Sequence, residues 1–246
     1  MEARGHRPRP DGRGDGLPRK GSVQRGERIR KEAPETLRAA ASDLRYLLNR
    51  GYPPGPAVRF VADHYYIDKD YRNILSRAVL SDDVAQTRRQ KAIGLEDLRG
   101  GELHIDGYNV LITIESVITG EDIFLCDDGF IRDMRCLFRK YRRSEATDEA
   151  VQLMINVISG ARPSGILLLL DKQISRSGEL ASDICEAFSA AGVPGTARTA
   201  RDVDRALKNS SAVVATSDGI IIDHVSSALD IPALIARRMM VEPIRI

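Results

Sequence analysis

Hydrophobic positions recur every three or four residues through the first folded part of the chain. Pro34 opens the first such run and Gly51 ends it, which indicates an amphipathic helix between them. Three further helices are predicted at about Ala57–Ile67, Lys69–Leu80 and Val84–Ile93. The pattern therefore predicts a small all-helical domain over residues 33–98, with a linker near its end.

After residue 98 short apolar runs alternate with amphipathic stretches. The runs predict strands at Leu103–Ile105, Ile123–Cys126, Gly165–Leu170, Gly195–Arg198, Ala212–Thr216 and Ala233–Ile235. The stretches between them predict helices at about Val110–Ile118, Phe130–Arg139, Thr147–Ser159, Gly178–Ala191, Val203–Lys208 and Asp223–Ala228. Strands interleaved with helices predict an α/β domain over residues 99–246, built on a three-layer, mostly parallel sheet.

The first 32 residues have a different composition, rich in Arg, Gly and Pro and almost free of large apolar side chains. Such a segment buries too little surface to offset its loss of entropy, so we expect a disordered basic tail over residues 1–32. An Arg/Gly-rich tail can hold RNA electrostatically. It can equally be a solvated extension or lie upstream of the true start.

Charge and composition narrow the class of protein. Residues 1–31 carry ten Lys and Arg against four acids, a net charge of +6, which leaves 27 against 31, or −4, for the remainder. The folded part is therefore not a globally basic nucleic-acid-binding surface. Three cysteines without a C-x-x-C pair, no apolar run of membrane-spanning length and no apolar signal core predict a cytoplasmic protein without a membrane partner.

Five aromatic residues lie close together in the sequence of the helical domain. They are Tyr52, Phe60, Tyr65, Tyr66 and Tyr71. We expect them to fill the core of a small helical bundle rather than to form a surface on which nucleic-acid bases stack. His64 is expected to pack between helices, because no second metal ligand lies at a suitable spacing.

Acidic residues follow four of the predicted strands. Asp106 follows the first, Asp127-Asp128 the second, Asp171 the third and Asp218 the strand at Ala212–Thr216. The carboxyl ends of parallel strands lie at one edge of a sheet, where such folds bind their ligands. A single strand-end Asp is ordinary, because Asp favours turns and helix caps. Four together would repel one another unless a cation lay between them.

Hard divalent cations with oxygen ligands, Mg²⁺ or Mn²⁺, would relieve this repulsion. Asp204 opens a short predicted helix beside the strand that ends at Asp218, and Asp223 lies five residues further on. The candidate metal ligands are thus Asp106, Asp171, Asp204, Asp218 and Asp223. Helix and turn capping by these residues is the alternative interpretation.

Hydroxyl and guanidinium groups near the same edge are candidate phosphate contacts. They are Thr216 and Ser217 after one strand, and Ser175, Arg176 and Ser177 before a predicted helix. A helix N-terminus with Ser and Arg nearby attracts anions. Capping by Ser175 or Ser177 explains the second group equally well.

Other chemistries lack their motifs. No G-x-G-x-x-G, G-x-x-x-x-G-K-[ST] or G-x-S-x-G sequence is present. Asp171 follows an apolar strand as a phosphoaspartate nucleophile would, but Lys172-Gln173 supply no second acid two residues later. The strand-end carboxylates therefore remain the leading candidate site.

Three short motifs resemble the NYN branch of PIN-like nucleases. Asp106-Gly107-Tyr108-Asn109 after a strand resembles the branch's D-G-x-N, and Val203-Asp204-x-x-Leu207 resembles its V-D-x-x-L helix. Ala215-Thr216-Ser217-Asp218 resembles its S-x-D signature. Each motif is short, but their order and spacing agree with that family.

From about residue 36 the chain is also similar to a prokaryotic family of uncharacterised proteins that join a helical N-terminal domain to a PIN-like domain. The similarity rests on Arg50-Gly51-Tyr52-Pro53, on the segment from Cys126 to Asp133, and on Ser175-x-Ser177-Gly178-Glu179-Leu180. It covers about 210 residues.

The resemblance implies a metal-dependent ribonuclease. Asp106, Asp204 and Asp218 would be the catalytic residues and hold Mg²⁺ or Mn²⁺, and Asn109 would orient Asp106 or the substrate. Ile220 stands where the family usually has a further acid, so Asp223 must replace it or the site lacks one ligand. Glu115, further along the same helix, is either another inward ligand or a surface residue.

Two other functions remain open. The missing acid favours a non-catalytic PIN-like module that binds RNA or protein. The helical domain is then the candidate surface for a homodimer or a protein partner. A phosphohydrolase of small nucleotides would use Asp171 and Arg176. RNA is the expected partner of the leading hypothesis.

Overall fold

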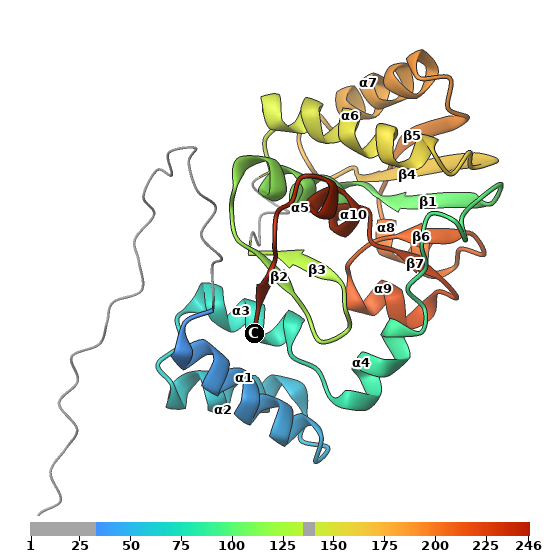
Figure 1. The fold of residues 1–246 in the computed structure, drawn as a ribbon. Helices are drawn as coiled ribbons and strands as arrows, with labels where there is room; N and C mark the ends of the chain where they lie inside the picture. Colours follow the sequence, from blue (N-terminus) through green and yellow to red (C-terminus); the bar gives the residue numbers. More distant parts are fainter. Residues whose placement is uncertain (1–32, 135–140) are drawn as a thin grey trace, which may run out of the picture.

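The computed structural model describes residues 33–134 and 141–246 (Figure 1). The expected tail over residues 1–32 and the end of the helix predicted at Phe130–Arg139 lie outside these ranges. Within them, four helices precede an α/β unit. The chain has the predicted fold class.

The helical region consists of α1 (Glu35–Leu48), α2 (Pro54–His64), α3 (Lys69–Ala78) and α4 (Asp82–Arg89). The apolar stripes of α1 to α3 form a common core, and the carboxylate of Asp68 caps α3 by accepting a hydrogen bond from the Tyr71 amide. No helix of the described ranges is long and apolar enough to cross a lipid bilayer. The predicted helices of this region are confirmed, with ends shifted by a few residues.

The aromatic residues of this region do not all lie in its core. Phe60 is 68% exposed, Tyr66 94% and Tyr52 55%. Only Tyr65 and Tyr71 pack against the buried cluster. The prediction that these aromatics fill the core is wrong for Phe60, Tyr66 and Tyr52. These three side chains project from the outer faces of their helices and connections.

The main sheet has five parallel strands in the order β5-β4-β1-β6-β7. They are β1 (Glu102–Asp106), β4 (Gly165–Asp171), β5 (Gly195–Ala200), β6 (Val213–Ala215) and β7 (Ala228–Leu229). From the central β1 the chain builds outward through β4 and β5, then crosses to the other side for β6 and β7. The strand order therefore reverses at β1, the kind of switch point where open α/β sheets form a crevice.

Helices cover both faces of this sheet (Figure 1). One layer contains α5 (Gly107–Thr119), α6 (Glu145–Ser159), α7 (Ser177–Ala190) and α10 (Ile231–Arg238). The other contains α8 (Val203–Lys208) and α9 (Gly219–His224). Alternate residues of β4 join the two cores: Leu168 and Leu170 pack in the first, Leu167 and Leu169 in the second. These are the three layers that the sequence predicts.

A second, three-stranded sheet was not predicted. It contains β2 (Ile123–Leu125), β3 (Ile131–Asp133) and β8 (Ile244–Arg245), with β3 antiparallel to β2. The predicted strand at Ile123–Cys126 therefore exists but does not belong to the main sheet. The helix predicted at Phe130–Arg139 is wrong at its start, because Ile131–Asp133 pairs with β2.

Two predictions near the C-terminus are also wrong. The strand predicted at Ala233–Ile235 lies inside α10, whose first turn contains Pro232 and is capped by the Asp230 carboxylate. The helix predicted at Asp223–Ala228 is displaced, because α9 ends at His224 and Ala228 pairs with β6 in the main sheet.

The helical region and the small sheet share one core. Phe124 and Cys126 from the small-sheet segment and Ile244 from β8 lie in the same buried cluster as Leu37 and Leu44 of α1. On the other side, Ala92 forms an isolated bridge to Ala228 at the edge of the main sheet. The helices are therefore packed into the α/β unit rather than linked to it as a separate body.

Candidate active site

The carboxyl ends of β1 and β6 bring the two main sequence motifs together. Ile105 of β1 pairs with Ala215 of β6, so Asp106 and Thr216 end neighbouring strands. Helix α5 begins at once with Gly107, where a Cβ atom would lie 2.7 Å from the carbonyl oxygen of Leu169. Glycine is required here because α5 starts in contact with the backbone of β4.

Hydrogen bonds fix both motifs to each other. Thr216 Oγ1 donates to Asp106 Oδ2 at 2.9 Å. Asn109 Oδ1 accepts from the Ser217 amide at 2.8 Å and from Ser217 Oγ at 3.0 Å. The amide oxygen of Asn109 is thus used within the protein, and its Nδ2 group makes no hydrogen bond to the described residues. All four side chains are buried.

Asn109 lies inside helix α5 rather than at its N-cap position. Helix α5 starts at Gly107, which puts Asn109 inside the first turn and Asp106 at the N-cap position. The Asn109 N–H faces the Asp106 carboxylate and lowers its pKa, but no hydrogen bond of ordinary geometry closes a cap there. Helix capping therefore does not account for Asp106.

Two further carboxylates lie close enough to act on Asp106. Asp218 follows Ser217, and its Oδ1 caps α9 by accepting from the amides of Ile220 and Ile221. Asp204 lies on the first turn of α8 and forms no hydrogen bond or ion pair with the described residues. The sheet and these two short helices thus bring Asp106, Asp204 and Asp218 close enough for their charges to act on one another.

The electrostatics of this group are unusual for aspartates. Burial first, and then the charges of Asp218 and Asp204, raise the pKa of Asp106 to about 7, against the lowering effect of the hydrogen bond from Thr216. The pKa of Asp204 is also raised, by partial burial and then by the charge of Asp218. Lys208 opposes that shift only in part. Like charges therefore converge at this edge.

Asp171 lies at the periphery of the same group. It ends β4, and its charge contributes to raising the pKa of Asp204. Burial and the charge of Asp171 together raise the pKa of Tyr108, in α5, to about 12. Asp171 Oδ1 accepts from the Gln173 amide at 2.7 Å, which turns one oxygen toward its own loop.

The chemistry of these side chains fits a hard divalent cation. Carboxylate oxygens are the ligands that Mg²⁺ and Mn²⁺ prefer, and a cation would remove the mutual repulsion of Asp106, Asp204 and Asp218. In the described ranges, however, no group of three or more His, Cys, Asp or Glu side chains is already arranged as a complete metal site.

Residues 95–234 match the family described as Domain of unknown function (DUF5616). The chain belongs to this family. Residues 36–91 match a second family, described as Protein of unknown function (DUF434). All the candidate acids fall within the DUF5616 segment, and the helical region coincides with the DUF434 segment.

A protein of Methanocaldococcus jannaschii, named Uncharacterized protein MJ0935, is similar over most of its length. The two are 36% identical over 200 residues, which cover 80% of this chain and 95% of the archaeal protein. No solved structure matches the chain significantly. These comparisons establish the family and assign no activity.

Asp223 does not join the other acids of the DUF5616 segment. Both of its oxygens accept hydrogen bonds from Arg88 of α4, at 2.7 and 2.8 Å, and this pairing lowers the pKa of Asp223. Asp223 therefore serves as a contact between α4 and α9. It does not replace the acid that is missing at Ile220, which is 58% exposed.

Asp127 and Asp128 are also part of structural ion pairs. Because β2 lies in the small sheet, the two acids do not follow a strand of the main sheet. Asp127 accepts from Arg45 of α1, and fully buried Asp128 accepts two hydrogen bonds from Arg132. The expectation that four strands of one sheet end in carboxylates is wrong for this pair.

Arg132 is the site residue that sequence reasoning missed. It is 2% exposed, and its Nε donates to the carbonyl oxygen of Ser217 at 2.8 Å. It thereby supports the turn that carries Thr216 and Asp218. A single Arg in a segment predicted to be helical gave no signal of this role.

The predicted phosphate contacts are only partly close to the acids. Thr216 and Ser217 are buried in the hydrogen-bond set described above. Arg176 is exposed and pairs with Glu179 within its own helix, while the Ser177 side chain is buried at the start of α7 and Ser175 is exposed. The loop does follow Asp171, but none of its three side chains is hydrogen-bonded to an acid of the cluster.

Glu115 points inward but away from the strand-end acids. It accepts hydrogen bonds from the hydroxyls of Tyr141, at 2.5 Å, and Thr147, at 2.6 Å. This network ties α5 to the start of α6, and burial together with the hydrogen bond to Glu115 raises the pKa of Tyr141. The prediction that Glu115 is a surface residue is wrong, and its partners are protein groups.

Proposed function

We propose that the protein is a divalent-cation-dependent phosphodiesterase that acts on RNA. The observation that carries the proposal is the convergence of Asp106, Asp204 and Asp218 at the switch point of the parallel sheet. The order of the three motifs, which resembles PIN-like nucleases of the NYN branch, supports the choice of RNA. Free thiols at Cys126 and Cys185 support a cytoplasmic location.

The protein groups divide into ligands and supports. Asp106, Asp204 and Asp218 would hold Mg²⁺ or Mn²⁺, with Asp171 as a further candidate. A bound cation would activate water and stabilise the charge that develops on the phosphate. Thr216 holds the Asp106 carboxylate in place, and Arg132 and Ser217 hold the turn that carries Asp218.

Asn109 is suited to contact the substrate or to steady Asp106. Its oxygen is held by Ser217, so the orientation of its amide group is fixed. The Nδ2 group remains as a hydrogen-bond donor beside the acids. A donor at this position would bind a phosphate oxygen once a cation has reduced the negative charge of the cluster.

Cleavage of labelled single-stranded RNA in the presence of Mn²⁺ tests the proposal. We expect the full chain to cleave RNA and Asp106→Ala to reduce the rate by at least about 100-fold, as expected for loss of a group that holds a catalytic cation. The matched control is Asp70→Ala, which removes an exposed acid of α3. Equal rates for wild type and Asp106→Ala would refute the catalytic role.

One observation favours a non-catalytic binding module of the same fold. Ile220 replaces an acid, and one oxygen of Asp218 is already used to cap α9. This alternative predicts RNA binding without cleavage and no change of melting temperature on addition of Mn²⁺. The small-nucleotide phosphohydrolase has less support, because Arg176 is paired with Glu179 rather than directed to Asp171.

A further inference from the structure

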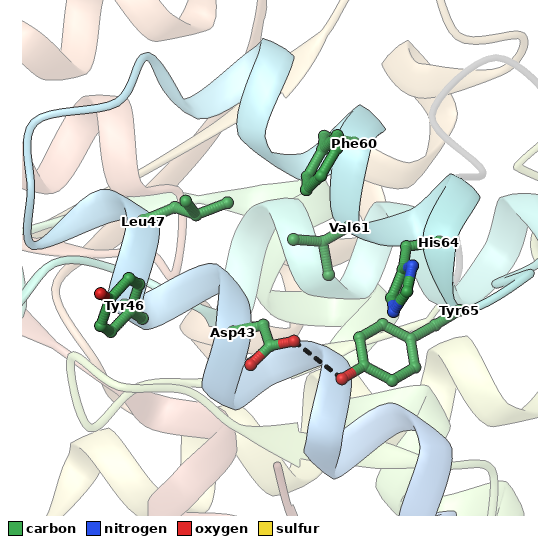
Figure 2. A pocket seen from close by; sticks show the side chains of 7 residues that line it. All are labelled: Asp43, Tyr46, Leu47, Phe60, Val61, His64 and Tyr65. Atoms are coloured by element: carbon green, nitrogen blue, oxygen red, sulfur yellow. Dashed lines mark hydrogen bonds between the residues drawn. The ribbon is translucent and has the colours of Figure 1, made fainter.

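A pocket of about 270 Å³ lies between α1 and α2, apart from the acid cluster. Figure 2 shows the side chains of two helices facing one another around it. The residues that line it are Asp43, Tyr46 and Leu47 from α1, Phe60, Val61 and His64 from α2, and Tyr65, which follows α2. The pocket shares no residue with the acids of the DUF5616 segment.

The walls of this pocket are aromatic and face solvent. Tyr46 is 57% exposed and Phe60 68% exposed, although neither position is required to be aromatic by the packing of the helical core. His64 and Tyr65 meet edge to face with their ring centroids 4.8 Å apart. Exposed flat rings on both sides of a hollow suit a ligand that is itself flat and apolar on its faces.

The one carboxylate among the residues that line the pocket, Asp43, accepts hydrogen bonds rather than donating them. Asp43 Oδ2 accepts from the Tyr65 hydroxyl at 2.7 Å, a bond that raises the pKa of Tyr65. Asp43 Oδ1 makes no hydrogen bond to the described residues. A carboxylate here repels a phosphate inside the pocket, but it accepts an N–H from the edge of a nucleobase.

Positive charge lies beside the pocket rather than inside it. The guanidinium carbon of Arg50 is 3.4 Å from the centre of the Tyr46 ring, which fixes that ring and keeps the cation next to it. Arg59 precedes Phe60 on α2, is exposed, and forms no ion pair with the described residues. This arrangement suits a nucleic-acid strand that places a base in the pocket and its phosphates outside, beside Arg50 and Arg59.

We propose that this pocket binds one unpaired base of a single-stranded nucleic acid. Its volume lies just below the range of about 300–1,000 Å³ that is usual for small-molecule sites, so it holds one ring system rather than the face of a partner helix. The proposal concerns binding alone. It stands whether or not the acid cluster cleaves phosphodiesters.

Fluorescence anisotropy tests the proposal. The ligand is a labelled single-stranded RNA of about 12 nucleotides, which is within the usual site size of proteins that bind single strands. The full chain is titrated in EDTA, so that no cleavage occurs. We expect Phe60→Ala and Tyr46→Ala each to raise Kd by about 5- to 150-fold, the effect of losing one base–aromatic stack. The control, Tyr66→Ala, removes a 94% exposed ring that does not line the pocket and is expected to leave Kd unchanged.

Four results would overturn the proposal. The first two are a wild type that does not bind the strand, and pocket variants that bind it as tightly as the wild type. A third is a nucleoside monophosphate that competes with an affinity equal to that of the strand, which would identify a free nucleotide as the ligand. The fourth is a wild-type dimer that Phe60→Ala converts to a monomer, which would identify a second copy of the chain as the occupant.

Discussion

At the scale of single residues, Asp106 combines burial with like-charged neighbours. It is 8% exposed, and the hydrogen bond from Thr216 only partly offsets the cost of removing its charge from water. Asp204 and Asp218 add to that cost. Such an arrangement destabilises the folded protein without a cation, and this is typical of functional sites.

Replacing Asp106 with Asn tests this electrostatic cost. The folded pKa of about 7 lies above the ordinary value of 3.8, so the unfolded carboxyl ionises first as the pH rises. The stability that protonated Asp106 contributes is therefore present below about pH 4 and lost as the pH rises through 7. Between pH 4 and pH 8 in metal-free buffer, the free energy of unfolding of Asp106→Asn should rise relative to that of the wild type by up to about 4 kcal/mol.

Urea unfolding at a series of pH values measures this gain. The control is Asp70→Asn, which changes an exposed acid on α3 and should follow the wild-type pH dependence. A stability difference between Asp106→Asn and wild type that does not vary with pH would contradict the electrostatic account.

At the scale of elements, the close approach of α5 to β4 determines where Asp106 lies. Gly107 allows this approach because the helix begins directly after the strand, with Leu168, Leu169 and Leu170 around it. A methyl group at Gly107 would lie 2.6 to 2.8 Å from atoms of these three residues. One of those atoms is a backbone oxygen, which cannot move without shifting β4.

We expect Gly107→Ala to destabilise the protein by about 1–3 kcal/mol, the usual cost of overpacking a dense site. The control is Gly178→Ala at the start of α7, where nothing lies within 4 Å of an added methyl group and no loss is expected. Denaturant midpoints at unchanged slope measure both effects. Equal midpoints for Gly107→Ala and wild type would show that α5 can retreat from β4 at no cost.

The sequence predicted those elements whose local pattern and tertiary environment agree. β1, β4 and the helices of the first region were predicted because their apolar periods are long and their ends carry Pro, Gly or Asp. The segment at Ala233–Ile235 was misread because its short apolar run is compatible with either a strand or a helix. Only its neighbours, Pro232 and the capping Asp230, select the helix.

The candidate site was predictable where single residues end strands of the main sheet. Asp106 and Asp218 were singled out in this way, and Asp204 was singled out because it opens the short helix α8. Asp127 was misplaced because no local pattern shows that β2 belongs to another sheet, and Arg132 was missed because its partner Ser217 lies 85 positions away. Contacts of that kind are set by topology rather than by local sequence.

At the scale of the whole molecule, the helical region completes the core of the α/β unit. Phe124, Cys126 and Ile244 are buried against α1 to α3. Across the other contact, Arg88 of α4 pairs with Asp223 of α9, the helix that Asp218 caps, and Figure 1 shows these two helices side by side. The acid cluster therefore depends on contacts from the helical region.

A chain of residues 95–246 tests this dependence. Without α1 to α4 it would expose the apolar surface around Phe124 and leave Asp127 and Asp128 without Arg45 and Arg88, so we expect it to unfold at a lower temperature than the full chain. Differential scanning calorimetry of both chains measures the effect. A cooperative transition of the short chain at the temperature of the full chain would contradict the shared core.

Isothermal titration of the metal-free full chain with Mn²⁺ tests the central claim most directly, because it measures cation binding without assuming a substrate. We predict saturable Mn²⁺ binding to wild type that Asp106→Asn and Asp218→Asn each weaken by at least about tenfold, with Asp70→Asn unchanged. No Mn²⁺ binding by wild type, or binding that neither substitution affects, would show that the strand-end acids do not form a metal site.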